Sequence, residues 1–453
     1  MDALYGAALR LAWVASIPYQ IVMAALLGRP AVPWRERLGR APQLSSLPPG
    51  ALWVHAVSFG EVRLAHAVIA ALRARLPLPV VLTTTTGTGR ALAERWRRER
   101  SPGAADAVAA PPLDLPGPIG RFLDAARPRA LVLVETELWP NLLRLAPARG
   151  VPVVVVNGRV SPRGFARLQR ARSLFAPGMA AIHLVAAQSE EDAARFVVLG
   201  VPAERVKTTG NIKFDLPVPE AAGDPVRRRL ALGDGATVFV AGSTARAEAK
   251  PVAEAFAALR AASPGAILVI APRHPEDVAP ARRLLERPGW RVRLWSAFEG
   301  SGDPARAVSA EDLARRASGA DPAYDVVVVD TMGVLPSLYA CATVAFVGGS
   351  LVTRGGQNLL EPAAAGVPVL FGPHVDTVRF AAEALLASGG GFQVADGAAL
   401  AAEVLRLAGD AGARSAAGAR ARDTVKRNRG ALDWTVALVA GAIGNPAARA
   451  GRR

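Results

Sequence analysis

Short apolar runs alternate with longer amphipathic stretches through most of the chain. Stretches such as Val62–Arg75 have the spacing of helices, with apolar residues on one face. Apolar runs that alternate with helices, and that show no polar face, indicate parallel sheets covered on both sides. We therefore expect ten buried strands: Ala51–Val57, Val80–Thr85, Ala130–Val134, Val151–Asn157, Ile182–Ala187, Thr237–Ala241, Ala266–Ala271, Val326–Asp330, Thr343–Val347 and Pro368–Gly372.

A proline-rich stretch, Leu216–Asp224, interrupts this alternation near the middle of the chain. It predicts a linker, so the fold class is α/β with two doubly wound, Rossmann-like domains that face a cleft. We expect the first domain at 29–216, the second at 217–430, and an apolar helix within 431–453 that packs back on a domain. Ligands of such domains bind at the carboxyl ends of the strands.

The N-terminus holds an apolar run, Leu11–Leu27, followed by a basic segment with Arg29, Arg35, Arg37 and Arg40. Its length is near the lower limit for a membrane-spanning helix. The arginines favour a cytoplasmic position for the chain that follows. We expect residues 1–28 to be a membrane-anchor helix, either spanning or half-inserted; a buried helix of a soluble domain is the alternative.

Composition narrows the classes of function. The 453 residues are 51% hydrophobic and 20% charged, which excludes a disordered protein. Cys341 is the single cysteine, so a disulfide framework and a multi-cysteine metal site are excluded. The formal net charge is +16, and 50 of the 54 basic residues are arginine. This charge favours anionic partners: phosphorylated substrates, anionic lipid headgroups or nucleic acid.

Three glutamates are expected at strand ends of the first domain. Glu61 follows the turn at Gly60 and opens a helix, where a carboxylate is either a helix-start charge or a general base. Glu135 and Glu137 follow a buried strand and share one face, because strand side chains alternate. The alternative for this pair is an N-cap cluster for the next helix. Buried like charges at a strand end favour a functional role.

Two further features of the first domain have either a functional or an ordinary structural role. The run Thr83–Gly89 (TTTTGTG) is either an anion cradle or a plain hydroxyl-rich turn, and it lacks the lysine of a nucleotide triphosphate loop. Lys213, beside the linker, is one of four lysines in an arginine-rich chain. Its presence is explained either by a need for a compact point charge at this position or by simple chance.

The second domain has glycines or polar residues after four of its predicted strands. These are Gly242, Ser243 and Thr244, then Ala271–Pro275, then Asp330–Gly333, and finally Gly348–Glu361 with Gly349 and Ser350. Glycines let backbone N–H groups approach a phosphate, Arg273 can fork onto an anion, and Glu361 can accept from ribose hydroxyls. This constellation predicts nucleotide-sugar binding.

Together these segments resemble the 3-deoxy-D-manno-octulosonic acid (Kdo) transferases, the lipid A glycosyltransferases of Gram-negative bacteria. The resemblance covers nearly the whole chain. It is carried by the N-terminal apolar segment and by HAVSFGEV, TTTTGTG, ETELWPNL, NGRVSPRG, QSEEDAARFVVLG, TGNIKFD, GST, APRHPE, DTMG and GGSLVTRGGQNLLEPAAAGVPVLFGPH.

The resemblance implies a GT-B fold and an inverting transfer of Kdo from CMP-Kdo to the tetra-acylated lipid A precursor (lipid IVA). It implies no catalytic metal and no cofactor. It also implies that Glu61 is the general base, and that Glu135 and Lys213 support the transition state. Ser58, Thr86, Gly87 and Glu137 are then acceptor-side candidates. CMP would be held by Pro272, Arg273, Met332, Gly333, Val334, Asn358, Leu359, Leu360 and Glu361, together with the glycine-rich strand ends.

Location and partners follow from the same resemblance. We expect the protein at the inner membrane, with its catalytic domains on the cytoplasmic side. The expected partners are CMP-Kdo, the lipid A precursor in the membrane and anionic lipid headgroups, without nucleic acid.

The chain departs from the family pattern in its donor domain. Ala245 replaces a histidine, Ala249 an acidic residue and Val334 a glutamate, and the stretch after GPH reads VDTVRF. Two rival functions remain: another nucleotide-sugar enzyme, such as a non-hydrolysing epimerase, and a non-catalytic basic membrane or nucleic-acid binding protein. Few aromatic residues and scattered arginines disfavour the latter.

Overall fold

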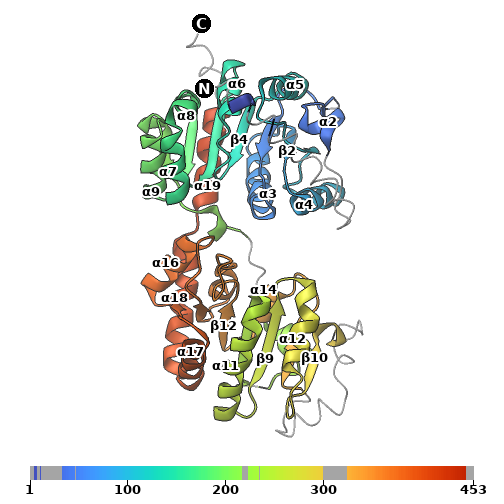
Figure 1. Cartoon of the computed structure of the whole chain (residues 1–453), viewed down its shortest axis with the longest axis vertical. Coiled ribbons are helices and arrows are strands. Elements are labelled where there is room, and N and C mark those ends of the chain that lie inside the picture. Colours follow the sequence, from blue (N-terminus) through green and yellow to red (C-terminus); the bar gives the residue numbers. More distant parts are fainter. Residues whose placement is uncertain are drawn as a thin grey trace. The chain divides into compact units, whose positions relative to one another are not determined.

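The chain forms two compact units, and each is described here by itself (Figure 1). The computed structural model describes residues 5–7, 11, 33–45, 47–216, 223–233, 235–298 and 324–444. Unit 1 is Met1–Leu216 together with Asn428–Arg453, and unit 2 is Pro217–Arg427. In the described residues each unit has one seven-stranded sheet whose strands all pair in parallel. The predicted α/β class with two parallel-sheet domains is therefore confirmed.

The sheet of unit 1 has the strand order β3-β2-β1-β4-β5-β6-β7. The order reverses between β1 and β4, and the carboxyl ends at such a reversal form the usual ligand crevice. The strands are β1 Leu52–His55, β2 Val80–Thr83, β3 Ala107–Ala109, β4 Ala130–Val134, β5 Val153–Gly158, β6 Leu184–Ala187 and β7 Val206–Thr208. The helices are α2 Trp34–Arg37, α3 Phe59–Arg73, α4 Gly87–Arg98, α5 Pro116–Ala126, α6 Pro140–Ala148, α7 Pro162–Arg170, α8 Arg172–Ala181, α9 Glu190–Val198 and α19 Ala431–Gly444.

Both faces of this sheet are covered by helices, as the two-sided apolar strands predict. In β1, Trp53 belongs to one apolar cluster, with α5, α6 and α8, while Leu52 and Val54 belong to the other, with α3 and α4. Alternate strand side chains point to opposite faces, so the central strands supply both clusters. All four residues of β1 are buried.

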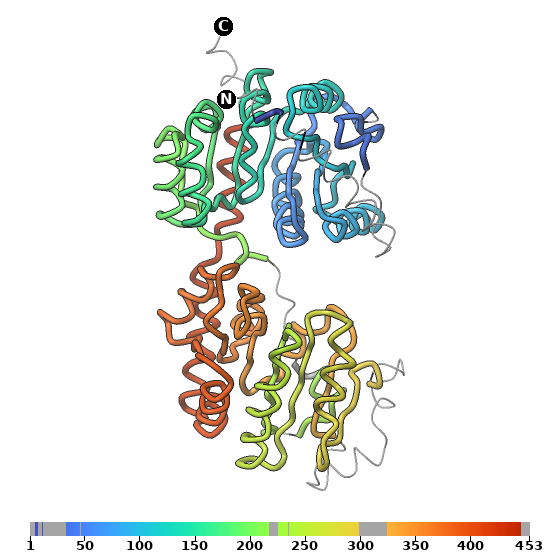
Figure 2. The backbone as a smooth tube through the Cα atoms, in the orientation of Figure 1, coloured from blue at the N-terminus to red at the C-terminus, as the bar shows by residue number. Residues whose placement is uncertain are grey.

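Helix α19 returns from the end of the chain to complete unit 1. Val436, Val439 and Ile443 lie in the same apolar cluster as α3 and the inner strands. The red C-terminal helix is seen among the blue and green elements of this unit in Figure 2. The carboxylate of Asp215 accepts from the backbone N–H groups of Gly430 (2.6 Å) and Leu432 (2.8 Å), which fixes the start of the helix.

The sheet of unit 2 has the strand order β10-β11-β9-β8-β12-β13-β14, with its reversal between β8 and β12. The strands are β8 Val238–Thr244, β9 Ile267–Pro272, β10 Val292–Leu294, β11 Val326–Val328, β12 Val344–Val347, β13 Val369–Phe371 and β14 Gly391–Gln393. The helices are α10 Gly223–Arg229, α11 Ala249–Ala262, α12 Val278–Leu285, α14 Leu335–Tyr339, α15 Leu360–Ala364, α16 Arg379–Ser388, α17 Gly397–Gly409 and α18 Ala411–Arg427.

The predicted membrane anchor, residues 1–28, lies almost entirely outside the described residues. Residues 5–7 and 11 within it are helical, and the hydroxyl of Tyr5 donates to Asp114 at 3.0 Å. Among the helices that the structure describes, none combines the length and the apolar character needed to cross a bilayer.

Candidate active site

Glu61 lies in the first turn of α3, directly beyond the carboxyl end of β1. Its carboxylate accepts from the backbone N–H of Val57 and from the hydroxyl of Ser58, both at 2.8 Å. Ser58 is also the N-cap of α3, because its oxygen accepts from the N–H of Glu61. Burial raises the pKa of Glu61, and the charge of Glu135 raises it further, against the hydrogen bonds from Val57 and Ser58. The side chain therefore takes part in the start of α3 and carries a carboxylate whose pKa is raised.

Glu135 follows the last residue of β4, the strand next to β1. Its backbone has φ 62°, in the left-handed region that a non-glycine residue seldom adopts. Its carboxylate is 2.8 Å from the ammonium of Lys213. Lys213 lies on a short 3-10 turn, Ile212–Phe214, whose first N–H groups are held by the side chains of Asn157 and Asn211. The structure thus gives the unusual lysine a defined partner.

Glu137 shares this region with the other two carboxylates. Burial, then the negative charges of Glu61 and Glu135, raise its pKa to about 7, although the indole N–H of Trp139 donates to it at 3.0 Å. The backbone N–H groups that start α6 donate instead to the carboxylate of Asp114. The N-cap explanation for the glutamate pair is therefore wrong.

Two buried residues that the sequence analysis did not select also belong to this region. The Nδ1 atom of His55 is 2.9 Å from the hydroxyl of Thr83, and its Nε2 atom is 4.0 Å from Glu137. Burial lowers the pKa of His55 to about 4, so the ring is neutral. Within the described part of the chain, Nε2 of His55 and Nδ2 of Asn157 have no hydrogen-bond partner. In the sequence, both His55 and Asn157 are polar residues at the end of a continuous apolar strand, and this pattern could have identified them.

The remaining acceptor-side candidates have local structural roles. The hydroxyl of Thr86 accepts from the N–H of Gly89 at 3.2 Å and caps α4, which begins at Gly87. Thr84 donates to the carbonyl of Val57 at 3.0 Å, which ties the run to the loop before α3. The hydroxyl-rich run therefore forms a capped turn beside the strand end that leads to Glu61.

In unit 2, predicted nucleotide residues from several strand ends line two adjoining cavities. One cavity of about 470 Å³ is lined by Ser243, Arg273, Gly349 and four neighbours. A smaller one of about 80 Å³ shares Ser243 and Arg273 and adds Pro272, Met332 and Gly333. The carboxyl ends of β8 and β9 and the segment after β11 thus contribute residues to one place. Gly242 allows the packing beneath, since a Cβ there would lie 1.9 Å from the Tyr339 hydroxyl.

The carboxylate of Glu248 accepts hydrogen bonds from the backbone amides of the glycine-rich loop. This carboxylate is fully buried and accepts from the N–H groups of Ala245, Gly349, Ser350 and Leu351 at 2.7–3.0 Å. Two strand ends, after β8 and β12, are joined in this way. The amides of Gly349 and Ser350 are therefore engaged within the protein, and they are not free to bind a phosphate as the sequence suggested.

The other predicted nucleotide residues lie around two short helices. Asn358 donates to Glu361 at 2.9 Å and accepts from the N–H of Leu360 at 3.1 Å. Val334 precedes α14 and Leu359 precedes α15. Burial, and next the charge of Glu361, raise the pKa of Tyr339. Among the residues described, the structure brings no three His, Cys, Asp or Glu side chains together as a metal site.

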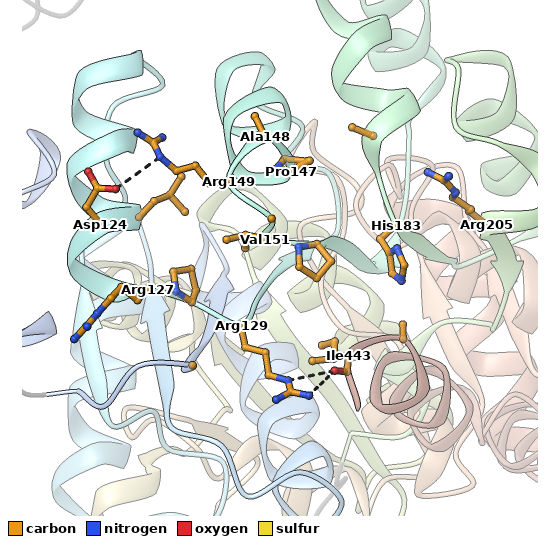
Figure 3. A pocket seen from close by; sticks show the side chains of 17 residues that line it. Asp124, Arg127, Arg129, Pro147, Ala148, Arg149, Val151, His183, Arg205 and Ile443 are labelled. Carbon is orange, nitrogen blue, oxygen red and sulfur yellow. Dashed lines mark hydrogen bonds and ion pairs between the residues drawn. The ribbon is translucent and has the colours of Figure 1, made fainter. Parts of the chain in front are cut away.

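A separate groove of unit 1 lies near the amino ends of its strands, away from these carboxylates (Figure 3). It has a volume of about 1150 Å³ and is lined by Arg127, Arg129, Arg149 and Arg205 among others. Arg129 donates to the carbonyl of Ile443 at the end of α19, and Arg205 to carbonyls at the end of α8. Cations at helix C-termini stabilise the unpaired carbonyls. Helix capping therefore accounts for these two arginines without a ligand.

Comparison with known proteins decides the family. Residues 33–216 match the family model described as 3-deoxy-D-manno-octulosonic-acid transferase (kdotransferase). The chain is 36% identical over 410 residues to the 3-deoxy-D-manno-octulosonic acid transferase of Bordetella pertussis, covering 88% of this chain and 89% of that protein. The chain belongs to the Kdo transferase family. It is therefore a glycosyltransferase, as the sequence analysis predicted.

Two more similarities place this Kdo transferase family member among known proteins. It is 31% identical over 350 residues to the Haemophilus influenzae enzyme of the same name, covering 75% of this chain and 74% of that one. The crystal structure of UDP-GlcNAc 2-epimerase from Neisseria meningitidis bound to UDP-GlcNAc is also similar, with a TM-score of 0.52 over 87% of this chain and 100% of that chain. At 13% identity, the epimerase similarity shows the fold alone.

Proposed function

We propose that this transferase moves Kdo from CMP-Kdo to a lipid A precursor, lipid IVA, with inversion at the anomeric carbon. The observation that carries the proposal is Glu61. It stands beyond the carboxyl end of β1, where the strand order reverses, and its pKa is raised by burial. A base with a raised pKa accepts a proton more readily near neutral pH than an ordinary glutamate does.

In the proposed reaction, Glu61 takes the proton of a primary sugar hydroxyl. The hydroxyl oxygen forms a bond to the anomeric carbon of Kdo while the bond from that carbon to the phosphate of CMP breaks. The bonding electrons leave with CMP, and the sugar passes through an oxocarbenium-like state. The ion pair of Glu135 with Lys213 supports this state by placing a fixed negative and a fixed positive charge near the reacting atoms.

The proposal assigns CMP to unit 2. Arg273 is the cation for the leaving phosphate, and Ser243, Pro272, Met332 and Gly333 line the same cavities. Asn358 and Glu361 are proposed for the ribose. The amides that bind Glu248 are left out of this assignment, so that side chains rather than the glycine-loop backbone contact the phosphate.

The acceptor of the proposed reaction is a lipid, so the enzyme works at a membrane. We propose the cytoplasmic side of the inner membrane, with the N-terminal apolar segment and anionic lipid headgroups as its contacts and without nucleic acid. Neither a catalytic metal nor another cofactor is assigned, because a carboxylate base and cationic side chains supply the proton transfer and the charge stabilisation.

A direct test uses CMP-Kdo with and without the lipid A precursor. We expect CMP release that depends on the lipid and a Kdo-containing lipid product, both in the presence of a metal chelator. CMP release at the same rate without the lipid, or no Kdo on the lipid, would contradict the proposed acceptor.

A further inference from the structure

An acid-free segment follows the carboxylates of unit 1. Between Glu137 and Glu190 the sequence contains seven arginines and no aspartate or glutamate. Four of these arginines, Arg163, Arg167, Arg170 and Arg172, lie on α7 and at the start of α8, and all four are exposed. We call these four residues the arginine face.

The geometry of α7 directs the arginine face to solvent. Its N-cap is Ser161, whose hydroxyl accepts from the N–H of Gly164 at 3.1 Å. Leu168 is buried in the apolar cluster of unit 1, and the half-buried ring of Phe165 packs against that cluster. Positions 163, 167 and 170 are four and seven residues along the helix from the first, so their side chains form one stripe. The apolar side is therefore used for folding, while the arginines on the other side are exposed.

Several exposed arginines on other helices have carboxylate partners within one turn. Arg97 pairs with Glu94, Arg282 with Glu286 and Arg406 with Glu403. The arginine face has no ion pair within the part of the chain that the structure describes. Like charges four residues apart destabilise a helix. Clustered, unpaired arginines thus work against the stability of α7, and an anionic partner outside the unit would offset that cost.

We propose that the arginine face docks unit 1 on the surface of an anionic lipid bilayer. Helix α7 follows β5, so it begins near the carboxyl ends of the strands, as Glu135 does. The hydroxyl of Thr136 donates to the carbonyl of Arg159 at 2.6 Å, which ties the glutamate loop to the segment that enters α7. Docking there holds the carboxylates near a membrane-bound acceptor. The role of this docking in presenting the acceptor rests on the proposed lipid acceptor, whereas the docking itself rests on the charge of the arginine face.

The arginine face fits a bilayer better than a nucleic acid. Single-stranded nucleic acids bind where aromatic rings are available for base stacking. The rings beside this face, Phe165 and Phe175, are half-buried and pack on the core. A charged bilayer surface needs only exposed basic side chains, and its attraction falls with salt.

The test compares two triple variants of the full chain on vesicles without acceptor lipid. The first carries Arg163→Gln, Arg167→Gln and Arg170→Gln. The matched control carries Arg97→Gln, Arg282→Gln and Arg406→Gln, which removes the same charge from arginines with carboxylate partners. Each arginine contributes about fivefold to binding of an anionic surface, so the first variant should bind phosphatidylglycerol-containing vesicles on the order of a hundredfold more weakly than the control.

A local probe separates docking through this face from attachment by the N-terminal segment, which all variants retain. Gln169 is exposed on α7, and Cys341 is buried, so a dye on Gln169→Cys labels the face selectively. We expect its emission to shift on phosphatidylglycerol-containing vesicles and to remain unchanged on pure phosphatidylcholine.

Two outcomes would overturn the proposal. One is equal binding of both triple variants to anionic vesicles, with no response of the probe. The other is that the first triple variant loses binding to a single-stranded oligonucleotide while its vesicle binding is unchanged. Because no turnover is measured, either result leaves the proposed Kdo transfer to be judged by its own assay.

Discussion

At the scale of single residues, three carboxylates and one ammonium determine the electrostatics of the candidate active site. The negative charge of Glu135 raises the pKa of Glu61, and the charges of Glu61 and Glu135 raise the pKa of Glu137. Glu135 itself has a cationic partner, Lys213, at 2.8 Å. Like charges in a partly buried region cannot all ionise without cost. We therefore expect Glu137 to hold a proton near neutral pH, which leaves Glu61 available as the base.

Replacing Glu137 by Gln tests that distribution of charge. The pKa of the Glu137 carboxyl is raised to about 7, so the folded state binds this proton more tightly than the unfolded state. Its contribution to stability is present below about pH 4.5 and is lost as the pH rises through about 7. Relative to wild type, Glu137→Gln should gain about 1–3 kcal/mol of stability across this interval. Melting temperatures measured through the interval check this.

Two results would contradict the expectation that Glu137 holds a proton near neutral pH. A variant that follows the wild-type pH dependence of stability would show that Glu137 is ionised throughout. Loss of CMP release in Glu137→Gln, with an unchanged melting curve, would show that the reaction needs its negative charge. Asp433→Gln serves as the control, because Asp433 is an exposed carboxylate on α19.

Sequence reasoning found the acidic residues of this region but not their surroundings. Glu61 and Glu135 could be placed because strand periodicity locates strand ends. The left-handed backbone of Glu135 and the positions of His55 and Asn157 depend on contacts with other strands and loops, such as Thr83 and Ile212. The binding of the glycine-loop amides by Glu248, about a hundred residues away in sequence, was also out of reach.

At the scale of elements, the ten strands expected from apolar runs are the five central strands of each sheet. The four strands that were missed, β3, β7, β10 and β14, are the edge strands, and each has three residues. The residues of β7 and β10 are partly exposed, so they lack a continuous apolar signal. Burial on both faces makes a central strand visible in sequence, whereas an edge strand depends on its neighbour.

Asp215 offers a test of how α19 is held in unit 1. Its carboxylate accepts two N–H groups at the start of that helix, and its loss leaves both without their partner. Replacing a capping side chain by Ala costs about 0.5–2 kcal/mol. In Asp215→Ala, hydrogen exchange of the amides in 431–444 should accelerate by roughly 2- to 30-fold. Asp433→Ala is the matched control, and equal acceleration in both variants would deny Asp215 this role.

At the scale of the whole molecule, fold and sequence family carry different information. The similarity to the UDP-GlcNAc 2-epimerase shows the architecture, at 13% identity. The 36% identity to the Bordetella pertussis transferase shows the family. The net charge of +16 is also unevenly compensated, since some arginines pair with a nearby carboxylate while, in the part of the chain that the structure describes, those of the arginine face do not. The sequence charge indicates an anionic partner, and the exposed arginine face is the surface that we propose for it.

The central claim is that Glu61 is the general base of Kdo transfer. Glu61→Gln keeps the shape of the side chain and an acceptor for one of its two hydrogen bonds, but it cannot take a proton. General base catalysis contributes about 10²- to 10⁴-fold, so lipid-dependent CMP release should fall by that factor while CMP affinity is unchanged. In the wild type the rate should rise with pH through the raised pKa of Glu61, and this acid limb should disappear in the variant.

The most direct measurement is therefore the rate of lipid-dependent CMP release by Glu61→Gln, taken together with its melting temperature. The account predicts a loss of at least about a hundredfold in rate with a melting temperature close to that of the wild type. A helix-start charge alone contributes about 0.3–1 kcal/mol to stability and nothing to turnover. A near-normal rate with a lowered melting temperature would contradict the account and leave Glu61 as a capping residue of α3.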